Sequence, residues 1–319
     1  MTDPAAPLYF DCDTGIDDAL ALAYLLASPE IVLAGIGTVS GNTTAAQAAR
    51  NTLGLLALSE RDDVPVAIGR HDFLTHEYDG GAPHVHGDDG VGGVALPAPA
   101  HPVEDGTAAD LLIRLSHEHA GSLEVLAVGP LTNLAAALEQ DPTLPSRVAR
   151  VTLMGGAALV PGNTSAVAEA NIANDPEAAA AVFAAAWPVV VVPLDVTMEN
   201  VFEESHRDLL ASSGSPVARA VAGMLDFYVD FYEPTFGRRC CALHDPLAAA
   251  IAVGRIASTV APAVPAVVDT TDGPGRGQTV FDLRGQRAGT VDHADANVRV
   301  VLAADPGFPQ HLAERVAGA

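Results

Sequence analysis

The fold of this chain is decided by residues 8–58, which read LYFDCDTGIDDALALAYLLASPEIVLAGIGTVSGNTTAAQAARNTLGLLAL. A short apolar run at 8–10 is followed by a helical pattern over 17–27, a second apolar run over 31–39 and a second helical pattern over 44–58. Strand, helix, strand, helix is the order found where helices connect parallel strands. The segment therefore predicts the beginning of an α/β fold.

The same alternation continues to residue 193. Apolar runs that indicate strands, with helical patterns between them, occupy residues 65–68, 108–119, 123–128, 131–139, 151–154, 176–186 and 189–193. The last run is valine at four successive positions, which is expected of a parallel strand covered on both faces. We therefore expect an α/β protein with an open, mostly parallel, doubly wound (Rossmann-like) sheet and helices on both faces.

The remainder of the chain adds elements without a visible boundary. Helical patterns at 205–213 and 216–232 and apolar residues near 298–302 predict additional C-terminal helices and short strands. No stretch has the composition of a linker, so we expect one domain over residues 1–319. Two long loops, 69–102 and 155–174, interrupt the alternation, and loops of this length are usually functional or mobile.

The charge balance narrows the possible partners. The chain has 16 basic and 40 acidic residues, a net charge of −24 at pH 7, and none of the basic residues is lysine. A field of this sign repels nucleic acid and anionic lipid. We therefore expect neither nucleic acid nor a membrane surface as a partner.

The cysteines and the N-terminus indicate a compartment. Cys12, Cys240 and Cys241 make an odd number, and two of them are neighbours, so no disulfide framework is expected. Cys240 and Cys241 are expected to be buried thiols. Residues 1–7 contain no basic, apolar leader, and no apolar run reaches membrane-spanning length. These features favour a cytoplasmic protein.

Four acidic residues follow the first predicted strand. Asp11, Asp13, Asp17 and Asp18 lie where a strand ends and a helix begins, the place where open α/β sheets bind ligands. The helix dipole accounts for Asp17 and Asp18 in a first helical turn, but not for Asp11 and Asp13. Carboxylates this close repel one another unless a hard divalent cation or shared protons relieve them. The cluster therefore predicts a metal-binding or catalytic site.

Other sites with clustered aspartates fit this sequence poorly. An EF-hand loop that starts at Asp13 needs Gly and Glu at the positions that hold Asp18 and Tyr24. The Asp-x-Asp-Thr start also occurs in haloacid dehalogenase-type phosphatases, which rely on a basic residue, usually lysine. A Walker A phosphate loop needs lysine as well. The absence of lysine argues against both classes.

Three further motifs extend the predicted site. The turns at residues 39–42 and 128–133 follow strands and fall on the same edge of the sheet as the acidic cluster, so a backbone carbonyl there is able to join a metal. Each turn alone is no more than a strand-to-helix connection. Asn163, Glu169 and Asn171 in the second long loop offer donors and acceptors that suit a polyhydroxylated ligand such as a sugar.

Histidine and tyrosine supply the remaining candidates. His244-Asp245 precedes an apolar helix, where such a pair is often only a cap, although histidine is also the usual general acid near neutral pH. His84 and His86 have zinc-ligand spacing but no supporting Cys or His nearby, so a mobile lid is favoured over zinc. Other candidates are Tyr228 and Tyr232, whose spacing of one helical turn is more often a feature of the core.

Together these motifs resemble the inosine-uridine preferring nucleoside hydrolase family, nearly end to end. The matching stretches are Asp11-Cys12-Asp13-Thr14-Gly15-Ile16-Asp17-Asp18-Ala19, Gly41-Asn42, Gly129-Pro130-Leu131-Thr132-Asn133, Met154-Gly155-Gly156, the set Asn163, Glu169 and Asn171, and His244-Asp245-Pro246-Leu247-Ala248. The family commonly has Pro where Thr14 stands, a difference that removes no ligand. Several ordered motifs are far more specific than any one of them.

The resemblance implies an enzyme that hydrolyses the N-glycosidic bond of ribonucleosides. It implies Ca²⁺ held by Asp13, Asp18, Asp245 and the carbonyl of Val128, with ribose hydroxyls and a water completing the shell. It makes Asp13 the general base on that water and His244 the acid that protonates the base. Predicted substrate contacts are Asp17, Asn42, Met154, Asn163, Glu169, Asn171, His86, Tyr228 and Tyr232. The family commonly forms homodimers or homotetramers.

Two alternatives stay open at the level of sequence. A ribonucleoside- or sugar-binding protein could keep the fold and lose turnover, although intact Asp13 and His244 argue against it. Hydrolysis of a modified nucleoside or another N-riboside is also compatible, because base preference depends on loop contacts that the sequence does not show.

Overall fold

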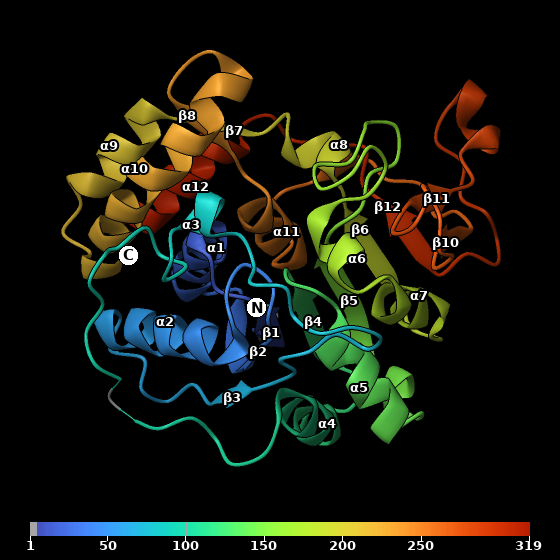
Figure 1. Cartoon of the computed structure of the whole chain (residues 1–319), viewed down its shortest axis with the longest axis horizontal. Helices are drawn as coiled ribbons and strands as arrows, with labels where there is room; N and C mark the ends of the chain where they lie inside the picture. Colours follow the sequence, from blue (N-terminus) through green and yellow to red (C-terminus); the bar gives the residue numbers. More distant parts are fainter. Residues whose placement is uncertain (1–4, 100) are drawn as a thin grey trace.

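The predicted strands form one parallel sheet. The computed structural model describes residues 5–99 and 101–319, so most of the N-terminal stretch 1–7 lies outside the described residues. Seven strands pair in the order β12-β6-β5-β4-β1-β2-β3, and every pair is parallel (Figure 1). Their bounds are β1 Ala6–Cys12, β2 Ile31–Thr38, β3 Val66–Ile68, β4 Leu123–Ala127, β5 Val148–Met154, β6 Val189–Val192 and β12 Val298–Val300. The predicted fold class is confirmed.

Helices cover both faces of this sheet. Successive residues of β1 point to opposite faces, so Phe10 packs in one apolar cluster and Tyr9 in another. The first cluster includes side chains of α1 (Ile16–Leu26), α2 (Ala45–Leu58), α9 (Glu204–Ala211), α10 (Pro216–Phe236), α11 (Asp245–Ala252) and α12 (Phe308–Ala317). The second includes side chains of α4 (Ala108–Glu118), α5 (Thr132–Gln140) and α7 (Pro176–Ala184). Burial of these two apolar layers stabilises the sandwich.

Several short elements lie outside the patterns that the sequence displays. Helices of about one turn lie in the long loops, α3 Pro83–His86 and α6 Ala170–Asn174, and in other connections, α8 Leu194–Thr197 and the 3₁₀ turns η1 Leu144–Ser146 and η2 Arg284–Ala288. Three two-stranded sheets pair β7 Val201–Glu203 with β8 Cys240–Ala242, β9 Ser258–Val260 with β13 Ala303–Ala304, and β10 Ala266–Val268 with β11 Thr279–Phe281. One turn is too short to show a helical period, so periodicity missed these elements.

The strand order creates a crevice at the centre of the sheet. From β1 the chain proceeds outward to β2 and β3, and it then returns to build β4, β5, β6 and β12 on the other side of β1 (Figure 1). The order therefore reverses between β1 and β4. Loops that leave two such strands diverge, and open α/β sheets bind ligands at this point. The acidic cluster follows β1, and the 128–133 turn follows β4.

The structure also describes the cysteines and the length and hydrophobicity of the helices. Cys12, Cys240 and Cys241 are buried free thiols, as predicted for the last two. In the described part of the chain, no helix combines the length and the apolar character needed to cross a membrane.

Candidate active site

A pocket of about 370 Å³ lies near the carboxyl ends of β1 and β4, where the strand order reverses. It collects side chains from both long loops, from α10 and from the start of α11. Its lining is Asp17, Asn42, Ala82, His84, Val85, His86, Val128, Met154, Asn163, Thr164, Glu169, Ala170, Asn171, Met198, Tyr228, Phe231, Tyr232, Thr235, His244 and Asp245. The predicted site residues Asp13 and Asp18 are not part of the lining, and both are buried.

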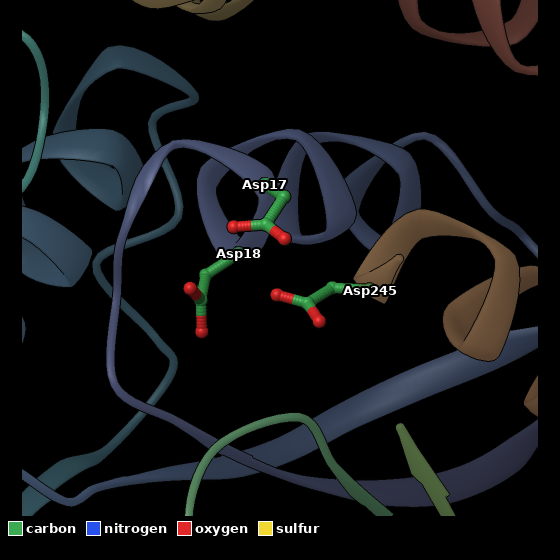
Figure 2. A group of neighbouring side chains, drawn as sticks. All are labelled: Asp17, Asp18 and Asp245. Atoms are coloured by element: carbon green, nitrogen blue, oxygen red, sulfur yellow. The ribbon is translucent and has the colours of Figure 1, made fainter. Parts of the chain in front are cut away.

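Three carboxylates converge beside this pocket. Asp17 and Asp18 lie in the first turn of α1, and Asp245 begins α11. One oxygen from each of the three lies within 4.8 Å of the others, and all three residues are buried (Figure 2). The grouping joins two parts of the chain that are far apart in sequence, because α1 and α11 pack in the same layer. Such a set of oxygen atoms is able to bind a metal ion.

Asp13 lies just beyond the end of β1 with one oxygen held and one free. Its Oδ2 accepts a hydrogen bond from Asn42 N at 2.6 Å, whereas Oδ1 has no partner among the described residues. A Cβ at Gly129 would come within 2.9 Å of Oδ1, and a Cβ at Gly41 would collide with Oδ2. Both strand-end turns therefore need glycine, because the carboxylate occupies the space of a side chain.

Asp18 closes the turn between β1 and α1. Its carboxylate accepts hydrogen bonds from Gly15 N at 2.8 Å and Asp13 N at 3.1 Å. Thr14, which stands where the family commonly has Pro, lies with its hydroxyl 2.7 Å from that of Thr52. The substitution thus adds a side-chain contact and leaves the capping by Asp18 in place.

Burial raises the pKa of every carboxyl in this group. Burial raises the pKa of Asp18 to about 7, and the charge of Asp17 adds to this shift. Burial also raises the pKa of Asp13, and there the charge of Asp18 adds to the shift. The pKa of Asp245 is raised by burial and then by its neighbours Asp17 and Asp18. Among the described residues, Asp17 Oδ1 also has no hydrogen-bond partner. A divalent cation would relieve both the repulsion and the unpartnered oxygens, so the donor set fits such an ion.

Asn171 and Glu169, which also line the pocket, hold the backbone around it through hydrogen bonds of their side chains. Asn171 Nδ2 donates to the carbonyl of Val128 at 2.7 Å and to that of Met154 at 3.2 Å. A carbonyl oxygen has two acceptor sites, so Val128 retains one. Glu169 caps α6 by accepting from the amides of Gly156, Asn171 and Ile172 at 2.9, 2.9 and 3.2 Å. Burial raises the pKa of Glu169 to about 7.

His86 is fixed in a single neutral form. Its Nδ1 accepts a hydrogen bond from Ile16 N at 3.0 Å, so the ring proton must be on Nε2. Burial lowers the pKa of His86 to about 3, which keeps the imidazole uncharged at neutral pH. Within residues 5–99 and 101–319, neither His84 nor His86 belongs to a group of possible metal ligands. His86 therefore presents a fixed N–H donor.

His244 is held between two hydroxyls. Its Nε2 lies 2.6 Å from Tyr232 Oη, and its Nδ1 lies 2.8 Å from Thr197 Oγ1. Burial lowers the pKa of His244, and Asp17 partly opposes the shift. No sequence motif pointed to Thr197, a buried residue at the end of the short helix α8.

The two tyrosines are both core residues and pocket residues. Tyr228 and Tyr232 are buried on α10, as their spacing suggested, and both also line the pocket. Tyr228 Oη donates to Asp17 Oδ2 at 3.0 Å, and burial raises the pKa of both phenols.

Asp11 belongs to a different environment from the other aspartates of its motif. It accepts hydrogen bonds from Tyr9 Oη at 2.8 Å and from Asn133 Nδ2 at 3.1 Å, and it does not line the pocket. Burial raises the pKa of Asp11 to about 7. Asn133, at the start of α5, is therefore the partner that accounts for this buried carboxyl.

A doubly wound α/β fold, with buried carboxylates able to bind a metal at a pocket where the strand order reverses, is typical of an enzyme that acts on a small molecule. Comparison with known proteins makes the class specific. The chain belongs to the inosine-uridine preferring nucleoside hydrolase family, whose model matches residues 8–308.

Individual relatives agree with this membership. The pyrimidine-specific ribonucleoside hydrolase RihA of Salmonella enteritidis is 39% identical over 243 residues, which cover 76% of this chain and 78% of the relative. The plant nucleoside hydrolase PpNRh1 superimposes with a TM-score of 0.91 at 31% identity, covering 99% of this chain and 100% of the other. A purine-preferring ribonucleoside hydrolase from Gardnerella vaginalis gives a TM-score of 0.89 at 33% identity, covering 98% of both chains. The protein is a nucleoside hydrolase, an enzyme that cleaves N-glycosidic bonds.

Proposed function

We propose that this enzyme hydrolyses ribonucleosides to ribose and free base at a Ca²⁺ site formed by Asp13, Asp18, Asp245 and the carbonyl of Val128. The observation that carries the proposal is two buried oxygens without a partner in the described part of the chain: Asp17 Oδ1, in the group with Asp18 and Asp245, and Asp13 Oδ1, on a carboxylate that repels Asp18 and Asp17. All donors are oxygen atoms, the ligands that Ca²⁺ prefers. Asp17 belongs to the same group of carboxylates, so its negative charge would also favour a cation there.

The attacking water requires a base, and Asp13 is suited to that role. Ca²⁺ held by Asp13, Asp18, Asp245 and the carbonyl of Val128 would supply positive charge that favours ionisation of a water. Asp13 Oδ2 is fixed by Asn42 N, which orients the carboxylate, and we assign acceptance of the water's proton to this carboxylate. The water oxygen then bonds to C1′ as the bond from C1′ to the base nitrogen breaks.

Ribose would be held by acid and amide groups from both walls of the pocket. We assign this contact to Asp17, Asn42, Met154, Asn163, Glu169 and Asn171, all of which line the pocket. Departure of the base leaves positive charge on the ribosyl group, and the buried carboxylates of Asp17 and Glu169 are placed to stabilise it. The same groups offer acceptors for the sugar hydroxyls.

The leaving base would receive its proton from the hydrogen-bonded pair of His244 and Tyr232. If the Thr197 hydroxyl donates to His244 Nδ1, the proton of His244 is on Nε2 and is donated to Tyr232 Oη. The Tyr232 hydroxyl hydrogen is then free to point into the pocket. We assign base protonation to His244 acting with Tyr232, and base contacts to His86 Nε2–H and Tyr228, which line the same pocket.

One experiment tests the substrate, the metal and the residues together. Cation-stripped protein is incubated with uridine, cytidine, inosine and guanosine, with and without Ca²⁺, and released ribose and base are measured. The panel contains both base classes because RihA is pyrimidine-specific, whereas the Gardnerella vaginalis relative is purine-preferring. We expect activity to return with about one Ca²⁺ per chain. Stoichiometric zinc in the purified protein, or full activity without metal, would contradict the proposal.

A matched pair of variants isolates the metal ligand. Asp18 and Asp110 both occupy position N3 and accept the N-cap amide of their helices, α1 and α4, but Asp110 is exposed and outside the carboxylate group. D18N is expected to lose Ca²⁺ binding and turnover, and D110N to retain both. Equal behaviour of the two variants would remove Asp18 from the ligand set.

Three properties of the whole protein stay predictions: one domain over residues 1–319, a homodimer or homotetramer, and a cytoplasmic location. Light scattering coupled to size-exclusion chromatography tests the oligomeric state.

A further inference from the structure

Residues 69–82 lead from β3 into the pocket wall. They end at α3, the single-turn helix that carries His84 and His86, both of which line the pocket. At this end, Ala82 N donates to the carbonyl of Asn42 at 3.0 Å. The beginning of the segment is attached elsewhere, to side chains that the mechanism above leaves without a role.

The first attachment is made by Asn133. Its Oδ1 accepts a hydrogen bond from Arg70 N at 2.8 Å, and its Nδ2 donates to Asp11 Oδ2 and to the carbonyl of Thr38, both at 3.1 Å. Because its Nδ2 faces two acceptors and its Oδ1 faces a backbone N–H, the side-chain amide of Asn133 can take only one orientation. A Cβ at Gly69 would collide with Asn133 Oδ1, which shows how closely the segment passes.

The second attachment depends on Thr132. Leu74 N donates to Asp175 Oδ2 at 3.0 Å, and the Thr132 hydroxyl donates to the same oxygen at 2.7 Å. The other oxygen of Asp175 accepts from Ala178 N at 3.0 Å and so caps α7. Thr132 and Asp175 are completely buried. A carboxylate held on two sides is a fixed acceptor for the segment.

The anchored part is packed against the part that reaches the pocket. The ring of Tyr78 lies 5.2 Å from that of His71 and 6.3 Å from that of Phe73, measured between centroids. At the far end, a Cβ on Gly81 would collide with the Tyr78 hydroxyl. Displacement of residues 70–74 would therefore shift the residues that deliver α3.

We propose that Thr132 and Asn133 are positioning residues of the reaction, which anchor residues 70–74 and thereby hold His84 and His86 in the pocket. The inference rests on the proposed function of the pocket. Contacts from α3 to the base exist before and during bond cleavage, so losing their alignment weakens binding uniformly and raises KM more than it lowers kcat. Neither Thr132 nor Asn133 lines the pocket, so both act through the segment.

The test uses T132V, which removes one hydroxyl with little change of shape, and N133A, which removes the other anchor. T132S keeps the hydroxyl and serves as the rescue. T152V is the matched control, because Thr152 is also completely buried and its hydroxyl has no partner among the described residues. Steady-state kinetics with the preferred nucleoside and hydrogen exchange of residues 70–82 are measured for each variant. If N133A does not fold, T132V alone decides.

We expect T132V to raise KM about three- to tenfold, the effect of losing one net hydrogen bond, with kcat within about twofold of wild type. Exchange should increase at Leu74 and its neighbours, whereas T132S and T152V should behave as wild type. Unchanged exchange and KM in T132V, or an equal change in T152V, would overturn the anchoring and leave the proposed function intact. A wild-type protein that releases base from no nucleoside would instead overturn the proposed function.

Discussion

Asp13 shows how a single residue can be prepared for two roles. One of its oxygens accepts a backbone amide, and the other is buried without a partner in the described structure. Backbone anchoring fixes the direction of the free oxygen, and burial makes an unpartnered charge costly in the absence of a cation. The carboxylate is thus held in one orientation with one oxygen left for a ligand.

Asp13→Asn tests these roles. The amide keeps the size of the side chain but is neither a base nor a charged ligand, so turnover should fall by about 10²-fold or more with the fold preserved. The measurement is kcat with the preferred nucleoside, alongside circular dichroism. Activity within a few-fold of wild type would assign the base to another residue.

His244 has a role that substrate chemistry can isolate. A nucleobase leaves poorly as an anion, so a positioned acid contributes on the order of 10²- to 10⁴-fold. A nitrophenyl riboside departs as a stable phenolate and needs no proton. His244→Ala should therefore damage hydrolysis of a natural nucleoside much more than hydrolysis of the nitrophenyl riboside.

Comparison with Tyr232→Phe refines that test. Because Tyr232 Oη lies 2.6 Å from His244 Nε2, removal of the hydroxyl should give the same selective loss. Equal losses on both substrates in His244→Ala would mean that His244 positions its sequence neighbour Asp245, and with it the metal, and does not protonate the base.

At the scale of elements, the turns after β1, β2 and β4 fit together around one carboxylate. Asp13 follows β1, Gly41 follows β2 and Gly129 follows β4. The two glycines leave the space that the Asp13 side chain fills. The parallel order of the three strands brings the turns to one edge, so the site depends on the register of the sheet.

Gly41→Ala tests that fit. The added methyl group would collide with Asp13 Oδ2 and would lie 2.7 Å from Pro130, so the turn or the carboxylate must move. A displacement of about 1 Å at a catalytic group can cost on the order of 10²-fold, and we expect kcat/KM to fall by about that factor. Gly214→Ala is the control, because a Cβ at that position would have no described atom within 4 Å. Comparable activity in both variants would contradict the steric argument.

For the whole molecule, the raised pKa values of the buried carboxyls predict that stability depends on pH and, at the proposed site, on the cation. Asp18 and Glu169 have pKa values of about 7 in the folded protein, above the ordinary values of about 4. Groups raised in this way bind protons more tightly when folded. Their stabilising contribution is complete below about pH 4 and is lost as the pH rises through about 7.

Cation-free protein should therefore melt at a lower temperature at pH 8 than at pH 5, by about 2 °C or more. The proposed site takes Ca²⁺ on ionised carboxylates, so added Ca²⁺ should raise Tm more at pH 8 than at pH 5. Thermal unfolding in chelator and in Ca²⁺, at one ionic strength, checks both statements. A Ca²⁺ effect independent of pH would argue against these carboxyls as the ligands.

The sequence determined the fold class and the edge of the sheet that carries the site. Both follow from local patterns: the alternation of strand and helix over residues 8–58, and the aspartates placed where the first strand ends. Parallel strands bring their carboxyl ends together whatever the details of packing. All the predicted substrate contacts therefore line one pocket, and the predicted metal ligands Asp13 and Asp18 are buried outside its lining.

Only the tertiary structure decided which atoms meet there. Ile16 N selects the tautomer of His86, Thr197 and Tyr232 bracket His244, and Asn133 rather than a metal satisfies Asp11. These partners come from separate elements, and no periodic pattern relates them. Hydrogen bonds depend on distances of about 3 Å and on direction, and those are set only when the helices pack on the sheet.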